Sequence, residues 1–171
     1  MIPELANYLG RIEDLRNQVA GLISDLPAEA LNWRPLDANG DHVTNSLAVL
    51  ATHAAGAEHF WISEIIGDLP KTRNRDAEFT TVATSGSEII ALLDKNRQET
   101  REVFYFLKES DLNDTREVDG KSIPVRWCIL HVIDHTALHL GHMQITTKLW
   151  IGGANYKSPR WFERLPNYQE F

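Results

Sequence analysis

The sequence predicts an all-α protein, a four-helix bundle with long connecting loops. Four segments repeat apolar residues every three or four positions, which is the spacing of one helix face. No convincing series of strands stands between them. With 171 residues, 43% of them apolar, the chain is long enough for one sizeable core and too short for two. We therefore expect a single domain over residues 1–171.

The first two helices are predicted from their start and stop signals. Residues 3–26 form helix one, which opens with a proline in its first turn. Residues 27–44 are crowded with Pro, Asn, Asp and Gly, so we expect an irregular connection in which Trp33 packs inward. Helix two begins near residues 44–46, whose hydroxyls can cap it, and ends at Gly67.

The second half of the chain predicts two further helices and a hairpin-like turn. Residues 68–84 are polar and lack periodicity, which indicates a long loop that could gate a site. Helix three covers residues 87–109, and a turn around Asp119-Gly120 lies within residues 115–123.

The fourth helix is the longest apolar segment. It opens at Pro124, continues to Trp150 and ends before the pair Gly152-Gly153. The irregular but aromatic tail, residues 154–171, is expected to pack on the bundle.

Composition excludes several classes of protein. The net charge of −7 and the absence of a Lys/Arg cluster argue against a nucleic-acid partner. Cys128 is the only cysteine, which excludes an intramolecular disulfide and cysteine-rich zinc sites. No segment has the length and apolarity of a signal peptide or a membrane span. We expect a soluble cytoplasmic protein without a membrane partner.

Four of the seven histidines gather on the fourth helix, at His131, His135, His139 and His142. At 100° per residue they share a stripe about 80° wide. Histidines four residues apart can reach one ion, and a catalytic zinc takes three protein ligands. His53, which lies among small residues in helix two, is the best candidate for the third ligand.

The alternative is that each histidine is an ordinary core residue bonded to a backbone carbonyl, which we would favour for His53 taken alone. For His135 and His139 that alternative needs separate partners for several buried imidazoles, so ligation is favoured. His131 and His142 are expected to contact the ligands or the substrate, or to pack in the core, rather than to bind the ion.

Four other polar residues are predicted at the surface. His59 lies about 240° around the helix from His53, and His42 falls in a loop. Glu58 and Asp134 lie off the histidine faces and are expected to be surface carboxylates.

The chain resembles the DinB/YfiT-like superfamily of metalloenzymes over most of its length. The resemblance is carried by Trp127 followed by His131-x3-His135-x3-His139-x-Gly141, and by Asn32-Trp33-Arg34-Pro35 followed by Ser46-Leu47-x5-His53 through Trp61.

The resemblance implies a four-helix bundle, often a homodimer, with a divalent metal bound by one histidine of helix two and a histidine pair of the last helix. Carried over by position, the ligands are His53, His135 and His139. The superfamily commonly has Gln directly after the glycine of this motif, whereas here His142 occupies that position and Gln144 follows. The role of position 142 therefore stays open.

A metal ion bound by three neutral histidines keeps its positive charge, so it lowers the pKa of a bound water and deprotonates a bound thiol. Zinc is the first expectation, with nickel, iron or manganese as alternatives. Because some members of the superfamily are thiol-dependent transferases or isomerases, the resemblance implies a low-molecular-weight thiol as co-substrate beside a small-molecule substrate.

Three alternatives stay open. A hydrolase would need a general base, and no HExxH motif is present because residues 132 and 136 are Val and Thr. A structural metal would be closed by a fourth ligand such as His131 or His142, whereas a catalytic one would face a cavity lined by residues such as Trp61 or the 68–84 loop. The histidines could also surround a small-molecule pocket without a metal.

Overall fold

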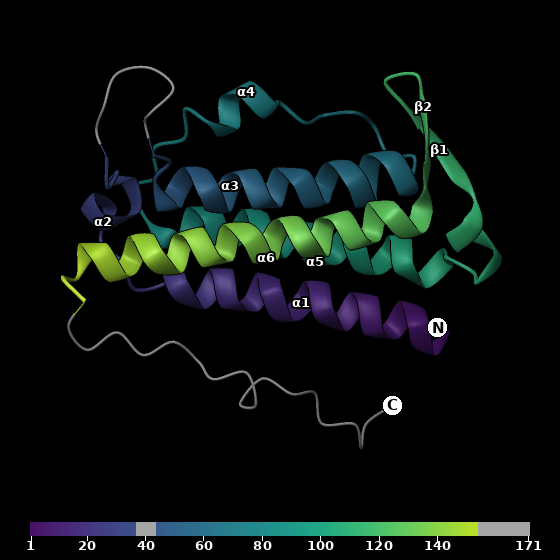
Figure 1. Cartoon of the computed structure of the whole chain (residues 1–171), viewed down its shortest axis with the longest axis horizontal. Helices are drawn as coiled ribbons and strands as arrows, with labels where there is room; N and C mark the ends of the chain where they lie inside the picture. Colours follow the sequence, from purple (N-terminus) through teal and green to yellow (C-terminus); the bar gives the residue numbers. More distant parts are fainter. Residues whose placement is uncertain (37–43, 154–171) are drawn as a thin grey trace.

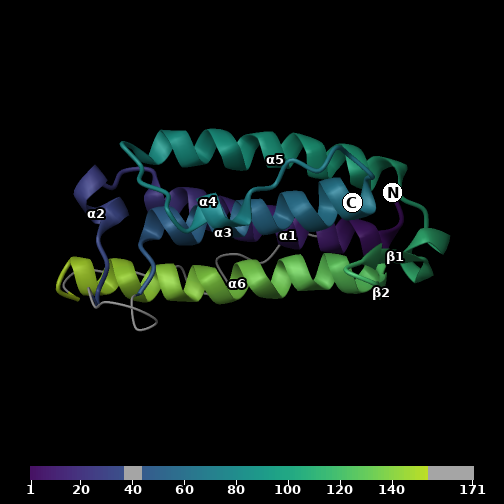
Figure 2. The same cartoon turned by 90° about the horizontal axis from the view of Figure 1, so that it is seen from above.

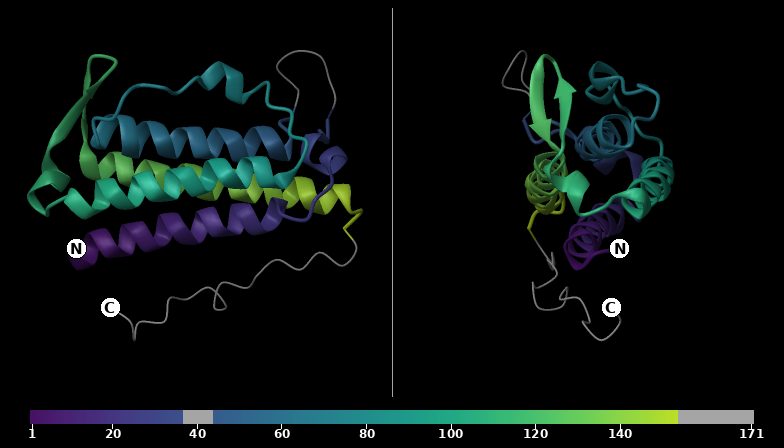
Figure 3. Two further views of the ribbon diagram at one scale, coloured as in Figure 1. Left: turned by 180° about the vertical axis from the view of Figure 1, so that it is seen from behind. Right: turned by 90° about the vertical axis from the view of Figure 1, so that its right-hand side faces the viewer.

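The computed structural model describes residues 1–36 and 44–153 of the chain. Long helices that run side by side form its body (Figures 1 and 2). They are α1 (Pro3–Ile23), α3 (Leu47–Glu58), α5 (Gly86–Phe106) and α6 (Val125–Trp150), with α3 continuing as the π-helix η1 (His59–Ile66). Seen end-on, α1 lies opposite α3, and α5 and α6 fill the two sides between them (Figure 3). The predicted all-α bundle is confirmed.

Short elements complete the described part. They are α2 (Ala28–Asn32), α4 (Arg75–Glu78), the 3-10 helix η2 (Ser110–Asn113), and the strands β1 (Thr115–Val118) and β2 (Lys121–Pro124). The two strands pair antiparallel. Asp119 and Gly120 connect them with φ values of 49° and 73°, the left-handed conformation that tight hairpin turns require. The predicted hairpin is therefore confirmed.

Local signals set the helix boundaries close to the predicted ones. Pro3 stands in the first turn of α1, and the Ser46 hydroxyl accepts the N–H of Val49 at 3.3 Å, which caps α3. Gly67 ends η1 as predicted. Trp33 is half-buried, and its ring meets that of Trp150 edge-on at 5.6 Å.

The apolar core has two parts, one at each end of the bundle. The part near α2 is built on Leu15, Val19, Ile23, Leu31, Leu47, Leu50, Leu93, Leu140 and Met143. The part near the hairpin is built on Leu5, Ile12, Ile62, Phe104, Leu112, Val125, Cys128, Ile129 and Val132. Polar side chains occupy the middle of the bundle, where the two parts meet.

The connection from η1 to α5 covers α3 instead of leaving it exposed, since α4 lies along the outer side of α3 (Figure 1). Two predictions of surface positions are wrong, because Glu58 receives side chains from α1 and α5 and His59 contacts α5 and the loop after η1. Glu58 is only 3% exposed and pairs with Arg16. His59 is half-buried, with its Nδ1 2.8 Å from Glu99 Oε2. Asp134 is exposed, as predicted.

Two predictions fall on residues outside the described ranges, namely the surface position of His42 and the packing of the tail at 154–171. Among the described helices, none combines the length and apolarity needed to cross a bilayer.

Candidate metal centre

The structure brings His53, His135 and His139 together between α3 and α6. His135 and His139 lie one turn apart on α6, and His53 faces them from α3. The Nε2 atoms of His53 and His135 are 3.1 Å apart, and those of His135 and His139 are 3.2 Å apart. Among the described residues these three form a cluster able to hold an ion, with all ligand atoms within 4.8 Å of one another.

The environment of His135 and His139 favours their neutral form. His53 is 8% exposed, and His135 and His139 are half-buried. Burial, reinforced by the neighbouring histidines, lowers the pKa of His135 to about 3 and that of His139 to about 4. Because protonation of these rings is disfavoured at neutral pH, their lone pairs remain available to a cation.

The three rings meet through their Nε2 atoms, and a neutral imidazole has only one N–H to donate. The Nδ1 atoms of His135 and His139 are buried and have no hydrogen-bond partner within the described residues. Because each Nδ1 points away from the convergent Nε2 atoms, an ion among the Nε2 atoms would not satisfy it. For an ion 2.0–2.1 Å from each nitrogen, tetrahedral geometry requires N–N separations of about 3.4 Å. The observed separations fit that geometry within a few tenths of an ångström.

Glu78 orients His53. Its Oε2 lies 2.7 Å from Nδ1 of His53. Since an ionised carboxylate only accepts, Nδ1 is the donor and the Nε2 lone pair points to the other two histidines. Arg73 donates to both oxygens of Glu78, at 2.7 and 3.0 Å. Burial opposes ionisation of Glu78, yet the hydrogen bonds from His53 and Arg73 outweigh it, and the pKa of this carboxyl is lowered.

Gly56 makes room for this carboxylate. It lies almost one turn after His53 on α3, and a Cβ at this position would overlap the carboxyl group of Glu78. Glu64 fixes the loop before α4, because its Oε1 accepts hydrogen bonds from the backbone N–H groups of Thr72 and Arg73 at 2.6 and 2.8 Å. The absence of a side chain at one position therefore allows α4 to reach the metal centre.

The three predicted neighbours of the ligands lie on two sides of the cluster. On the hairpin side, the ring of His131 stacks on Trp127 at 4.8 Å, and Trp61 meets His131 edge-on at 5.4 Å. On the α2 side, His142 is exposed, and its ring centroid is 5.6 Å from that of His139. Neither His131 nor His142 belongs to the group of convergent ligand atoms.

Sequence reasoning missed the residues that α4 contributes. Besides Glu78, Phe79 covers His53 with a ring distance of 4.8 Å. The loop from 68 to 84 was expected to lie near the site, but its polar sequence gave no sign of which carboxylate turns inward. Gly56 within a helix rich in alanine was the one available signal, since an isolated glycine in a helix often marks a close approach.

The fold is similar to solved structures of distant sequence. A conserved protein from Enterococcus faecalis matches with a TM-score of 0.68 and 16% identity, covering 89% of this chain and 99% of that one. A DinB-like protein from Bacillus cereus matches with a TM-score of 0.67 and 17% identity, covering 91% of this chain and 95% of that one. At these identities the likeness establishes the fold alone. No curated protein gives a significant match.

A family comparison reaches further than the structural one. Residues 4–149 match the family described as Mycothiol-S-transferase. This range contains all four long helices, nearly complete, together with the three convergent histidines. The resemblance to the DinB/YfiT-like superfamily is confirmed, and the chain belongs to the mycothiol-S-transferase family.

Proposed function

We propose that the protein is a metal-dependent thiol S-transferase, with a divalent ion bound by His53, His135 and His139. The observation that carries the proposal is the convergence of three Nε2 atoms, two pairs of which are 3.1 and 3.2 Å apart. Membership of the mycothiol-S-transferase family supports the thiol as co-substrate. Imidazole ligands suit zinc, nickel and iron, and zinc is our first expectation.

An ion with three neutral ligands keeps its positive charge and would hold a bound thiol in its thiolate form at neutral pH. The chain's own residues supply the geometry. Glu78 fixes the tautomer of His53, and Arg73 fixes Glu78. Phe79 packs against the ring of His53 and so shields one side of the cluster from water.

The thiol has to come from outside the chain. Cys128 is fully buried in the apolar core near the hairpin. Burial raises the pKa of its thiol to about 11, so the nucleophilic thiolate is scarce at neutral pH. This environment favours a low-molecular-weight thiol as the reacting group.

The two other metal-based functions have less support. A closed structural site would need a fourth ligand, and His131 and His142 stand outside the group of convergent atoms. A hydrolase would need a free carboxylate as general base. Glu58 is engaged by Arg16 and Thr100, and Glu78 is engaged by His53 and Arg73.

The metal assignment is tested by elemental analysis. Wild-type protein expressed with added zinc, nickel, iron or manganese is expected to retain about one equivalent per chain, as a single three-ligand site implies. The His139→Ala variant should lose most of it, whereas His142→Ala should keep it. Equal metal content in wild type and His139→Ala would contradict the ligand assignment.

The thiol is tested by spectroscopy of cobalt-substituted protein, since Co²⁺ reports its ligands through visible absorption. A mycothiol-like or other low-molecular-weight thiol should add an intense sulfur-to-cobalt charge-transfer band. The corresponding alcohol should not. Spectra that do not respond to any thiol would overturn direct thiol binding while leaving the metal site intact.

Three sequence predictions extend this proposal. We propose a cytoplasmic protein, a homodimer and a single domain over residues 1–171. Light scattering during size-exclusion chromatography measures the oligomeric state directly, and a monomer at micromolar concentration would refute the dimer.

A further inference from the structure

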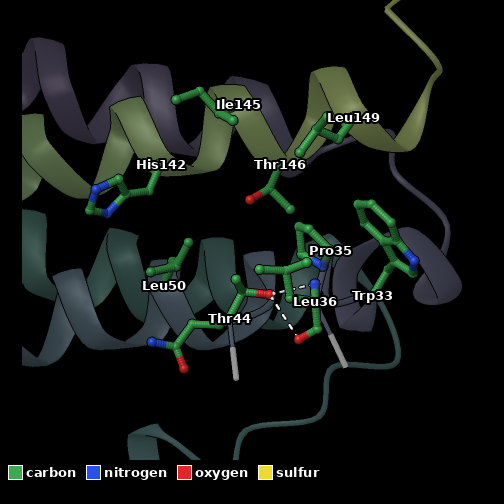
Figure 4. A pocket seen from close by; sticks show the side chains of 10 residues that line it. Trp33, Pro35, Leu36, Thr44, Leu50, His142, Ile145, Thr146 and Leu149 are labelled. Atoms are coloured by element: carbon green, nitrogen blue, oxygen red, sulfur yellow. Dashed lines mark hydrogen bonds between the residues drawn. The ribbon is translucent and has the colours of Figure 1, made fainter. Parts of the chain in front are cut away.

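A large cavity lies at the α2 end of the bundle, between α6 and the segments that flank α2 and α3. Its volume is about 700 Å³, within the range of about 300–1,000 Å³ typical of small-molecule sites. Figure 4 shows Thr146 and His142 on the α6 side, with Leu50, Leu36 and Trp33 on the other. The cavity is therefore large enough for a small organic substrate.

The cavity lies beside the histidine cluster, although none of the three convergent histidines lines it. On α3, Leu50 lines it one turn before His53. On α6, His142 and Thr146 line it one and two turns after His139. The rings of His139 and His142 approach to 5.6 Å between centroids. A molecule in the cavity would therefore have one end beside the convergent histidines.

The lining is mainly apolar. Six of the ten residues around the cavity carry hydrocarbon or indole side chains, namely Trp33, Pro35, Leu36, Leu50, Ile145 and Leu149, and the other four are Thr44, Asn45, His142 and Thr146. The Thr44 hydroxyl is already occupied, since it accepts the N–H of Leu36 at 3.0 Å and lies 3.3 Å from the carbonyl of the same residue. A heavily hydroxylated molecule would lose its hydrogen bonds to water here, whereas an apolar one would gain from burial.

We propose that this cavity binds the second substrate, an apolar electrophile that accepts the sulfur of the thiol. The inference rests on the proposed function and adds the substrate class to it. In the transfer the thiol sulfur forms a bond to an electrophilic carbon, and the bond from that carbon to its leaving group breaks. The leaving group departs with the electron pair, and the thiol proton passes to water. Atoms and charge are thus balanced without an oxidant or reductant.

His142 gains a role in this arrangement. Its position on α6 borders both the cavity and the ring of His139. We assign it as a contact to the acceptor, not to the ion. This assignment explains how a histidine can stand at a position where the superfamily commonly has glutamine.

The binding test uses N-phenyl-1-naphthylamine, an uncharged apolar fluorophore, and requires no catalysis. Wild-type protein should bind one equivalent with enhanced fluorescence. Thr146→Phe, which places a ring inside the cavity, and Leu36→Glu, which places a charge in it, should each weaken binding about tenfold, equivalent to about 1.4 kcal/mol. Both variants should retain the metal content of wild type.

Leu138→Glu is the matched control for Leu36→Glu. Leu138 is 58% exposed and Leu36 is 61% exposed, but Leu138 lies outside the cavity lining. Leu138→Glu should bind the probe as wild type does. Unchanged binding in both cavity variants, or equal weakening in Leu138→Glu, would overturn the assignment.

A kinetic test uses 1-chloro-2,4-dinitrobenzene as acceptor, which loses chloride when a thiol adds. Thr146→Phe should raise KM for the acceptor about tenfold and leave KM for the thiol unchanged. The two proposals fail separately. Probe binding that persists in a metal-free His139→Ala protein supports the cavity whatever the metal does, and normal metal binding with no effect of Thr146→Phe refutes the cavity alone.

Discussion

Two clusters of buried polar side chains lie midway along the bundle, and α3 contributes to both. On one face of α3, the carboxylate of Glu58 accepts a hydrogen bond from Nε of Arg16 at 3.2 Å and another from the hydroxyl of Thr100 at 2.6 Å. On another face, His53 meets the two histidines of α6. Arg16 is 1% exposed and Glu58 is 3% exposed, whereas His135 and His139 are half-buried, so the first cluster is shielded from water more completely than the second.

The two clusters differ in how their charges are balanced. The guanidinium of Arg16 and the carboxylate of Glu58 neutralise each other, although Nη1 of Arg16 has no further partner within the described residues. In the histidine cluster three Nε2 atoms converge, and no charged group from the part of the chain that the structure describes lies between them. The first cluster can hold α1, α3 and α5 together by itself, whereas we propose that the second holds an ion. On this proposal, buried polar groups serve structure in one place and function in the other.

The largest effect should follow from breaking the ion pair. Arg16→Met leaves the Glu58 carboxylate buried without its counter-charge, which should cost about 3–5 kcal/mol in the free energy of unfolding. Urea denaturation of metal-free protein measures it. Metal content per folded chain should not change. Arg101→Met removes the exposed pair with Glu13 and should cost less than about 1 kcal/mol. An equal loss of unfolding free energy in Arg16→Met and Arg101→Met would show that the buried ion pair stabilises the fold no more than the exposed one.

A smaller effect should follow from removing the ion. With free metal at 100 times its Kd, binding stabilises the folded state by about 2.7 kcal/mol. A chelator should therefore lower the melting temperature of wild type. It should leave His139→Ala unchanged, since that variant has no ion to lose. If the chelator changes the melting temperature of neither protein, the histidine cluster needs no ion for its stability, and the two clusters do not differ in this respect.

A third effect concerns the residues that orient His53. Glu78→Gln should weaken metal binding about 10–100-fold without abolishing it. Gly56→Ala should do the same by displacing the carboxylate. Gly10→Ala is the control, because a Cβ at Gly10 in α1 meets nothing within 4 Å. Competition with a chromophoric chelator gives the affinities. Unaltered affinity in Gly56→Ala would refute the positioning role of Glu78.

The smallest effect should come from Cys128. Because burial raises the pKa of this thiol to about 11, iodoacetamide should not modify it in the native protein at neutral pH, but should do so in urea. Cys128→Ala should keep the cobalt spectrum and its response to added thiol. A spectrum altered by Cys128→Ala would place the reacting sulfur inside the chain.

The helices could be predicted because their signals are local. Apolar periodicity, the Ser46 cap and the terminal glycines all act within one or two turns. The stop of helix two at Gly67 was predicted, whereas the π-helical winding of residues 59–66 was not. The helix α4 was missed because it has four residues and no apolar periodicity. Its position depends on contacts with α3, which are distant in sequence.

The site was partly predictable for the same reason. His135 and His139 share a helix, and His53 was proposed from its small neighbours in helix two before the resemblance to the superfamily pointed to the same residue. Glu58 was placed wrongly at the surface because its partner Arg16 lies 42 residues away. A helical wheel assumes that one face of the helix is exposed to water, whereas the face of α3 that carries Glu58 receives side chains from α1 and α5.

The π-helix η1 holds a contact that ordinary α-helical winding of the same residues would break. In an α-helix, residues five apart point in directions about 140° from each other, but the wider turn of a π-helix brings them onto one side. His59 and Glu64 meet in this way, with 3.3 Å between Nε2 and Oε1. Glu64 also anchors the backbone of Arg73, the residue that holds Glu78. Ordinary α-helical winding of residues 59–64 would turn the side chains of His59 and Glu64 about 140° apart and break their contact, even though none of the three convergent histidines lies in η1.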